Sequence, residues 1–274
     1  MTVAEPVVRL AVVCAGLWLA AKGWAVAVGP GPQTPGRGGP WRRELLWWLW
    51  PGLERRRFLF HACEPPAGGE RLRGAAFTLL GAGLFLLGGR LTDRGEPLIG
   101  GVCAAVGFVF ALHFGAFHLL ALALRRGGID AEPLMNRPLS AATLAEFWGR
   151  RWNTAFARLT RDGLFAPLAR RFSAGIALWA GFALSGAVHE AALTGPVFDR
   201  PGALYGGPFL YFLLQAAGTG LERRLRKAGR LGGVSNRLYA AAWLILPTPL
   251  LLSPAFLIDA AGPAAAFALS WLNT

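Results

Sequence analysis

Charged residues are scarce in this 274-residue chain, and so are the side chains that build metal or disulfide sites. Only 16% of its residues are charged, while 54% are hydrophobic, a balance that argues against a soluble domain and fits a polytopic membrane protein. The three cysteines, Cys14, Cys63 and Cys103, lack disulfide or zinc-ligand spacing, so we expect small buried side chains. With four histidines and no HExxH or CxxC motif, we expect no metal site and no resident cofactor.

Acidic residues are the scarcer of the two charged classes. There are 15 of them against 28 lysines and arginines, and all but two of the basic residues are arginine. Such an excess often indicates a nucleic-acid partner, but here the basic residues gather in loops between apolar stretches, where they suit lipid headgroups. We therefore expect membrane lipids and no nucleic acid as partners. Richness in alanine, glycine and arginine is typical of high-GC bacteria, so we expect the bacterial inner membrane.

The apolar stretches predict the membrane topology, because a spanning helix needs about 20 apolar residues. Pro247, Pro249 and Pro254 interrupt the last of these stretches, and the apolar tail 260–272 is short enough to be a half-span or a re-entrant segment. We expect one all-α polytopic integral membrane domain over residues 1–274, with about six to eight transmembrane helices. The candidate spans are 7–28, 74–89, 98–124, 173–194, 203–220 and 238–258.

The loop charges predict which side each loop faces. Loops 29–73, 125–172 and 221–237 each carry an excess of basic residues, so the positive-inside rule places them in the cytoplasm and both termini outside. Segment 41–58 holds four tryptophans among arginines and is too short to span. We expect it to lie at the membrane interface, with its rings at headgroup level.

Within loop 125–172, the sequence predicts an amphipathic cytoplasmic helix over residues 144–160. Thr143 and Glu146 form a capping box at its start. Its apolar stripe contains Phe147, Trp148 and Trp152, and its polar face contains Glu146, Arg150 and Asn153. This polar face either simply meets water or faces a mouth where an anionic substrate enters, since guanidinium groups bind phosphates well.

The second polar feature lies inside the candidate span 173–194. His189 and Glu190 are ionisable residues in an apolar helix, which makes them functional candidates. Ser185 lies four residues before His189, so the two side chains can meet, and a neutral imidazole could remove a hydroxyl proton. The alternative is a histidine that only binds a neighbouring helix. For His113 and His118, which do not share a helix face, we favour structural roles.

Two runs of residues together resemble a known family. They are Leu134-Met135-Asn136-Arg137-Pro138-Leu139 with Phe147-Trp148-Gly149-Arg150-Arg151-Trp152-Asn153, and Ser185-Gly186 with His189-Glu190. In this order they resemble the wax synthase branch of the membrane-bound O-acyltransferases (MBOAT), whose members carry PLM and FWGRRWN runs before a span ending in SG-x-x-HE. The resemblance covers roughly residues 108–258 and is most specific over 134–190.

This resemblance implies a helical bundle around a tunnel that an acyl thioester enters from the cytoplasm and a hydroxyl acceptor enters from the membrane. His189 matches the family's catalytic histidine, a general base on the acceptor hydroxyl. Asn153 matches the second signature residue, which supports the thioester or the chamber. The residues expected to contact substrate are Trp148, Arg150, Arg151, Trp152, Ser185 and Glu190.

The expected function is therefore a wax ester synthase-like transfer of a fatty acyl group to a long-chain alcohol or another lipophilic hydroxyl. The donor is acyl-CoA or acyl carrier protein, with acyl-CoA acting as co-substrate. The alternative is a non-catalytic lipid-binding or transport protein that shares the fold. Helix counting raises one difficulty, because His189 lies 16 residues after Ser173, roughly 24 Å along a helix, in a hydrocarbon core of roughly 30 Å. This count predicts that His189 lies nearer the outer side.

Overall fold

All described elements of the chain are helices. The computed structural model describes residues 4–29, 41–63 and 68–272, and it contains no strand within these ranges. Five helical stretches there are long and apolar enough to cross a membrane, so the chain is an all-α polytopic membrane protein, as its composition predicts. They are α1 (Ala4–Val28), α4 (Gly69–Asp93), α5 with η1 and α6 (Pro97–Phe108, Val109–Ala116, Phe117–Arg126), α10 with η5 and η6 (Ala174–His189, Glu190–Thr194, Gly195–Val197), and α14 with η7 and α15 (Pro254–Phe256, Leu257–Ala261, Gly262–Leu272).

The first four of these stretches overlap the candidate spans 7–28, 74–89, 98–124 and 173–194. The candidate span 203–220 corresponds to α11 (Gly207–Lys227), which starts later than expected. Its last two turns contain one acidic and four basic residues, so α11 is too charged to count among the five apolar stretches.

The candidate span 238–258 differs most from the structure. The chain forms α12 (Gly233–Ile245) and the short α13 (Thr248–Leu251), because proline cannot donate the backbone hydrogen bond that would continue a helix. A new helix then starts at Pro254, where the Ser253 hydroxyl accepts a hydrogen bond from the Phe256 amide at 3.2 Å. The tail is consequently part of a 19-residue helical stretch over residues 254–272, which is longer than the half-span predicted from residues 260–272.

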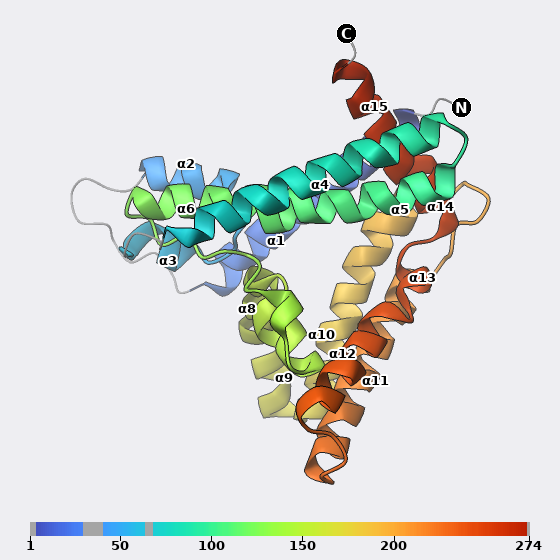
Figure 1. Ribbon diagram of the computed structural model, residues 1–274. Coiled ribbons are helices and arrows are strands. Elements are labelled where there is room, and N and C mark those ends of the chain that lie inside the picture. Colours follow the sequence, from blue (N-terminus) through green and yellow to red (C-terminus); the bar gives the residue numbers. More distant parts are fainter. Residues whose placement is uncertain (1–3, 30–40, 64–67, 273–274) are drawn as a thin grey trace.

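Glycine allows two helix pairs to approach closely. Figure 1 shows α4 and α5 side by side, and a Cβ atom at Gly81 would lie 2.1 Å from the backbone nitrogen of Ala111. Helices α10 and α11 also run side by side, where a Cβ atom at Gly186 would lie 3.0 Å from the Phe209 backbone. Gly186 therefore lets the helix that carries His189 pack tightly against α11.

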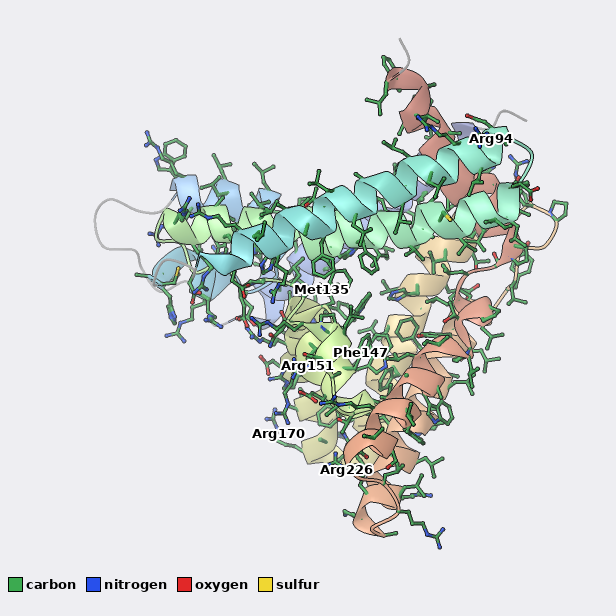
Figure 2. All side chains as sticks on the ribbon, viewed as in Figure 1. Arg94, Met135, Phe147, Arg151, Arg170 and Arg226 are labelled. Atoms are coloured by element: carbon green, nitrogen blue, oxygen red, sulfur yellow. The ribbon has the colours of Figure 1, made fainter. Side chains whose placement is uncertain are left out.

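The ends of several spans lie together in the structure. The start of α1, the turn between α4 and α5 and the end of α15 lie at the same end of the molecule (Figure 1). In the view of Figure 2, Arg94 in that turn lies at the opposite end from Arg170 and Arg226, which come from two predicted cytoplasmic loops. The placement of the basic loops in the cytoplasm stays a prediction of the positive-inside rule.

The tryptophan-rich segment is only partly the interfacial surface that we expected. It forms α2 (Trp41–Leu49) and α3 (Arg55–Phe60). Trp41 is exposed, but Trp47 is fully buried because the Lys22 ammonium lies 3.7 Å from its ring centroid and donates to its backbone oxygen at 2.6 Å. Lys22 also donates to the backbone oxygen of Gly52 at 2.8 Å. This buried lysine therefore binds the segment to α1 and holds the Trp47 ring in the core.

Candidate active site

The predicted helix 144–160 is interrupted at residues 152–153. It consists of α7 (Leu144–Glu146), the π-helix η3 (Phe147–Arg151) and α8 (Thr154–Thr160). The helix starts as predicted, because the Thr143 hydroxyl accepts a hydrogen bond from the Glu146 amide at 3.0 Å. The break arises because the backbone there hydrogen-bonds to an earlier part of loop 125–172. The Thr154 amide donates to the backbone oxygen of Leu134 at 2.8 Å. Loop 125–172 ends in two further helices, η4 (Arg161–Phe165) and α9 (Ala166–Arg171).

Asn153 lies at this break in a left-handed conformation with φ of 40°, which asparagine tolerates better than most residues. Its side-chain oxygen accepts a hydrogen bond from the Phe156 amide at 3.3 Å and so caps α8. Its amide nitrogen Nδ2 has no hydrogen-bond partner among the described residues. No hydrogen bond joins Asn153 to His189 in the described part of the chain, so Asn153 offers a side-chain donor without contacting the proposed base.

The two motif arginines differ in how they are bound. Arg151 forms an ion pair with Glu146 at 2.6 Å and donates to the Ser140 hydroxyl at 2.9 Å, so it holds the loop together and is not free for substrate. The pKa of Glu146 is lowered, first by the hydrogen bond from the Ala142 amide and then by Arg151. Arg150 is exposed and has no ion-pair partner among the described residues, so of this pair it is the one available to an anionic ligand.

Helix α11 packs against the motif segment and binds it through polar residues that the sequence did not single out. The Trp148 indole donates to the Gln215 side-chain oxygen at 3.1 Å, and the Gln215 amide donates to the Trp243 backbone oxygen at 2.7 Å. Two turns further along α11, the Glu222 carboxylate accepts hydrogen bonds from the Leu144 and Ala145 amides at 2.8 and 3.0 Å. Both polar side chains are almost fully buried. Their seven-residue spacing puts them on one helix face, which is the signal that could have identified them.

His189 is held through one ring nitrogen. Its Nδ1 lies 2.8 Å from the backbone oxygen of Ser185. Because a carbonyl oxygen can only accept, Nδ1 carries the proton in the neutral ring, and Nε2 keeps its lone pair. Nε2 has no hydrogen-bond partner among the described residues. The ring also packs on Phe212, with 4.4 Å between centroids. This geometry presents a basic nitrogen in a fixed orientation.

The predicted contact between the Ser185 hydroxyl and the His189 ring does not form. The hydroxyl donates instead to the Gly181 backbone oxygen at 3.1 Å, as serine commonly does one turn back in a helix. Ser185 thus contributes its backbone carbonyl to the site, and its side chain is not the partner of the imidazole.

The depth of His189 is less extreme than helix counting predicts. The helical stretch continues past it to Val197 and has 24 residues from Ala174, so its middle falls between residues 185 and 186. At about 1.5 Å per residue, His189 lies about 5 Å from that middle. The continuation is a π-helix, and π turns occur frequently at functional sites. His189 therefore lies near the middle of this helical stretch.

Glu190, predicted to contact substrate, is engaged elsewhere. Its two carboxylate oxygens accept hydrogen bonds from the Gly206 and Phe209 amides, at 3.0 and 3.3 Å. These amides begin α11, where an anionic cap also favours the helix dipole. Glu190 thus fixes the start of α11, and with it Phe212, relative to the neighbouring His189.

Aromatic rings connect the motif helix with the histidine. Trp148 contacts Phe212 at 5.4 Å and Phe182 at 6.0 Å between ring centroids. Trp152 contacts Trp148 at 6.4 Å, and Phe114 of η1 contacts Trp152 at 6.0 Å. Segments far apart in the sequence therefore meet in one largely apolar shell, in which Trp148 and Trp152 serve as walls. Such a shell suits an acyl chain and excludes water from the reacting groups.

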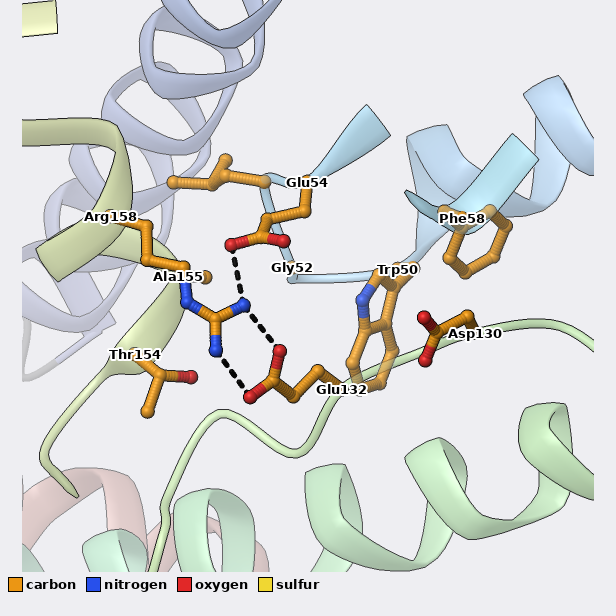
Figure 3. Close-up of a pocket in the computed structure, with 10 residues that line it drawn as sticks. Trp50, Gly52, Glu54, Phe58, Asp130, Glu132, Thr154, Ala155 and Arg158 are labelled. Atoms are coloured by element: carbon orange, nitrogen blue, oxygen red, sulfur yellow. Dashed lines mark hydrogen bonds and ion pairs between the residues drawn. The ribbon is translucent and has the colours of Figure 1, made fainter. Parts of the chain in front are cut away.

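A second cluster of polar residues lies between α3, α8 and loop 130–132 (Figure 3). Arg158 binds Glu54 at 2.6 Å and also pairs with Glu132, and the Glu132 carboxylate raises the pKa of this guanidinium first, followed by Glu54. Arg57 binds Asp130 at 2.8 Å. The cavity beside them has about 20 Å³, which holds about one water molecule. This site is too small for an acyl chain, and its charges are already paired. The described residues contain no group of metal-binding side chains.

Residues 131–210 match the family described as the membrane bound O-acyl transferase family. The chain is 30% identical over 153 residues to the probable long-chain-alcohol O-fatty-acyltransferase 9 of Arabidopsis thaliana, covering 51% of this chain and 43% of that protein. It is 29% identical over 109 residues to a long-chain-alcohol O-fatty-acyltransferase of Simmondsia chinensis, covering 37% and 30%. It is 30% identical over 93 residues to the acyl-CoA–sterol O-acyltransferase 1 of Arabidopsis thaliana, covering 31% and 27%. No solved structure matches the chain.

These similarities confirm the resemblance to the wax synthase-like membrane-bound O-acyltransferases for the part of the chain that carries both motifs. In each pair named above, the match spans less than half of the relative's own length.

Proposed function

We propose that this chain is a membrane-bound O-acyltransferase that moves a fatty acyl group from an acyl thioester to a long-chain alcohol or another lipophilic hydroxyl, with His189 as general base. The observation that carries the proposal is the geometry of His189. Its Nδ1 is bound to the Ser185 carbonyl, so the lone pair of Nε2 is available within an aromatic shell. The family match over residues 131–210 supports the same chemistry.

The reaction requires His189 to take one proton from the acceptor hydroxyl and later to give it to the leaving thiolate. Nε2 of His189 takes the proton of the acceptor hydroxyl as the oxygen attacks the thioester carbonyl carbon, and the carbonyl electron pair moves to its oxygen. When the tetrahedral intermediate collapses, the carbon–sulfur bond breaks and the thiolate leaves. The imidazolium then returns the proton to that thiolate. The thioester supplies the driving force, so this route uses acyl-CoA as co-substrate and no resident cofactor.

The remaining residues have distinct parts in this proposal. Trp148 and Trp152 line the path of the acyl chain, and the free amide nitrogen of Asn153 supports the thioester. Arg150 receives the phosphates of the donor at the cytoplasmic side, because it is the exposed motif arginine without an acidic partner. The donor is acyl-CoA or acyl carrier protein, both of which carry a phosphopantetheine, and the membrane is the inner membrane of a bacterium.

The test is the release of free CoA from palmitoyl-CoA by detergent-solubilised protein, with and without hexadecanol. Wild type and His61→Ala, a variant of an exposed histidine after α3, should release CoA only when the alcohol is present. His189→Ala and Asn153→Ala should release it far more slowly. Equal rates for wild type and His189→Ala would rule out His189 as the base. Absence of alcohol-dependent release with long-chain alcohols and sterols, from either thioester donor, would favour a lipid-binding protein instead.

A further inference from the structure

His113 has a buried ring nitrogen that the reaction above does not use. It lies in η1, the π-helical segment Val109–Ala116, which belongs to a different candidate span from His189. Phe108 and Phe117 pack against its ring, with centroids 6.2 and 5.6 Å away. The next residue, Phe114, belongs to a continuous chain of ring contacts that runs through Trp152, Trp148 and Phe212 to His189. Segment η1 therefore adjoins the aromatic shell in which His189 lies.

The Nδ1 atom of His113 is buried and has no hydrogen-bond partner among the described residues. A buried polar atom without a partner costs free energy, so it needs an explanation such as a missing ligand. Nε2 of His118, on the same helical stretch, also has no hydrogen-bond partner among the described residues, but it lies 3.1 Å from a Glu70 carboxylate oxygen. No described carboxylate lies within ion-pair distance of His113.

A side chain of η1 also contacts the motif of loop 125–172. Phe114, the residue after His113, contacts Trp152 at 6.0 Å between ring centroids. The π-helical winding of this segment shifts its side chains relative to an α-helix, as π turns do at functional sites. The segment that carries His113 thus packs against the motif helix through the neighbouring residue, Phe114.

We propose that His113 is a catalytic residue that donates a hydrogen bond from Nδ1 to the thioester carbonyl oxygen. The proposal rests on the function proposed above. His189 already accepts the proton of the acceptor hydroxyl, and the negative charge that develops on the carbonyl oxygen then requires a donor. No bond to His113 forms or breaks: its N–H stays on the ring while the oxygen gains and then loses the electron pair.

Turnover provides the first test, in the CoA-release assay with hexadecanol. His113→Phe keeps an aromatic ring but removes the donor, and we expect kcat to fall about 10²- to 10³-fold with little change in KM. His113→Gln keeps a donor and should recover at least tenfold over His113→Phe, while the control His118→Gln should keep wild-type kcat. A kcat for His113→Phe within threefold of wild type would overturn the proposal. Equally low rates for Phe and Gln with a lowered unfolding temperature would also overturn it, since they would indicate packing alone.

A binding measurement tests His113 independently of turnover. Isotope-edited infrared spectroscopy of palmitoyl-CoA labelled with ¹³C at the carbonyl, bound to His189→Ala, should show a carbonyl stretch at lower frequency than in free palmitoyl-CoA. Adding His113→Phe should abolish that shift. An unshifted stretch, or a shift that persists in the double variant, would contradict the role of His113 while leaving the proposed function intact. Failure of the wild type to release CoA would contradict the proposed function, and the infrared result would still decide on His113.

Discussion

The cluster around Arg158 and the site around His189 use polar side chains in opposite ways. In the cluster, three acidic side chains, Glu54, Asp130 and Glu132, are all bound by guanidinium groups. At the site, Nε2 of His189 and Nδ1 of His113 are without hydrogen-bond partners among the described residues. Paired charges join helices, whereas ring nitrogens without partners in an apolar shell remain available to hydrogen-bond a ligand. The Arg158 cluster is thus a set of mutually paired charges, whereas the surroundings of His189 hold nitrogen atoms that are open to a ligand.

The same contrast exists within the family-like motif. Arg151 is bound on both sides, by Glu146 and by Ser140, and Glu190 is bound to the start of α11. Their neighbours Arg150 and His189 are left open. Adjacent residues in a motif can thus have different tasks, one building the site and the next serving it. Substitutions should reveal this division as a difference between lost stability and lost turnover.

The largest effect is expected for His189→Ala. Removing the base should lower kcat by about 10²- to 10⁴-fold, while the unfolding temperature changes little because, among the described residues, the ring makes only one hydrogen bond and one close ring contact. Steady-state kinetics combined with thermal unfolding in detergent measures both quantities. A variant that loses stability and activity in proportion would place His189 with the Arg158 cluster, and the contrast between the two regions would disappear.

Arg158→Leu should show the opposite pattern. It removes one of the two guanidinium groups that pair with both Glu54 and Glu132, leaving Arg57 as the other, and breaking such partly buried charged pairs costs about 2–3 kcal/mol. We expect an unfolding temperature lower by roughly 5–10 °C, with kcat per folded molecule unchanged. The control is Arg161→Leu, an exposed arginine one turn away without an ion-pair partner in the described ranges. If Arg158→Leu lowered kcat at unchanged stability, the cluster would be part of the site.

Gln215→Leu probes the link between α11 and the motif. It leaves the Trp148 indole and the Trp243 backbone oxygen unpaired, which costs about 1–3 kcal/mol. Because Trp148 would move, kcat should fall by about tenfold. Thr219→Val is a matched control on the same helix, since the buried Thr219 hydroxyl has no partner among the described residues. Similar losses in both variants would show that the helix tolerates no change there, and would remove the special role of Gln215.

The smallest effect is expected for Arg150→Ala. Loss of one exposed phosphate contact should raise KM for palmitoyl-CoA about three- to tenfold and leave kcat unchanged. The difference from wild type should shrink in 0.5 M salt, because exposed charge interactions are screened. Arg170→Ala, at another exposed arginine of loop 125–172, serves as the control. A salt-independent loss of kcat in Arg150→Ala would contradict a binding role.

Much of the fold was predictable from apolar length and loop charge. The spans 7–28, 74–89, 98–124 and 173–194 follow from uninterrupted apolar runs, because backbone groups in lipid must be paired within a helix. The end of the molecule was less predictable. Ser253 restarts a helix that joins Pro254 to the tail, and a local cap of this kind is hard to distinguish from a break when prolines surround it.

The site was predictable only in part. The motif identified His189 and Asn153 as candidates, but a helical wheel treats residues 144–160 as one helix. Pairing of the Thr154 amide with Leu134 breaks that helix and turns Asn153 into a cap. The partners Phe212, Gln215 and Glu222 lie in α11, at sequence distances that no local pattern reports. Their spacing indicates a shared face without indicating what that face contacts.

The sequence by itself determined that this is an all-α membrane protein with two motifs of one acyltransferase family, because apolar runs and residue spacing are local properties. Only the tertiary structure decided which polar atoms are used and which are open. Arg151, Ser185 and Glu190 were expected to meet substrate, yet their side chains bind the protein itself. His113 was expected to be structural, yet its Nδ1 lacks a partner in the described part of the chain. Hydrogen-bond valences are filled by whichever groups folding brings near, and that depends on contacts between distant segments.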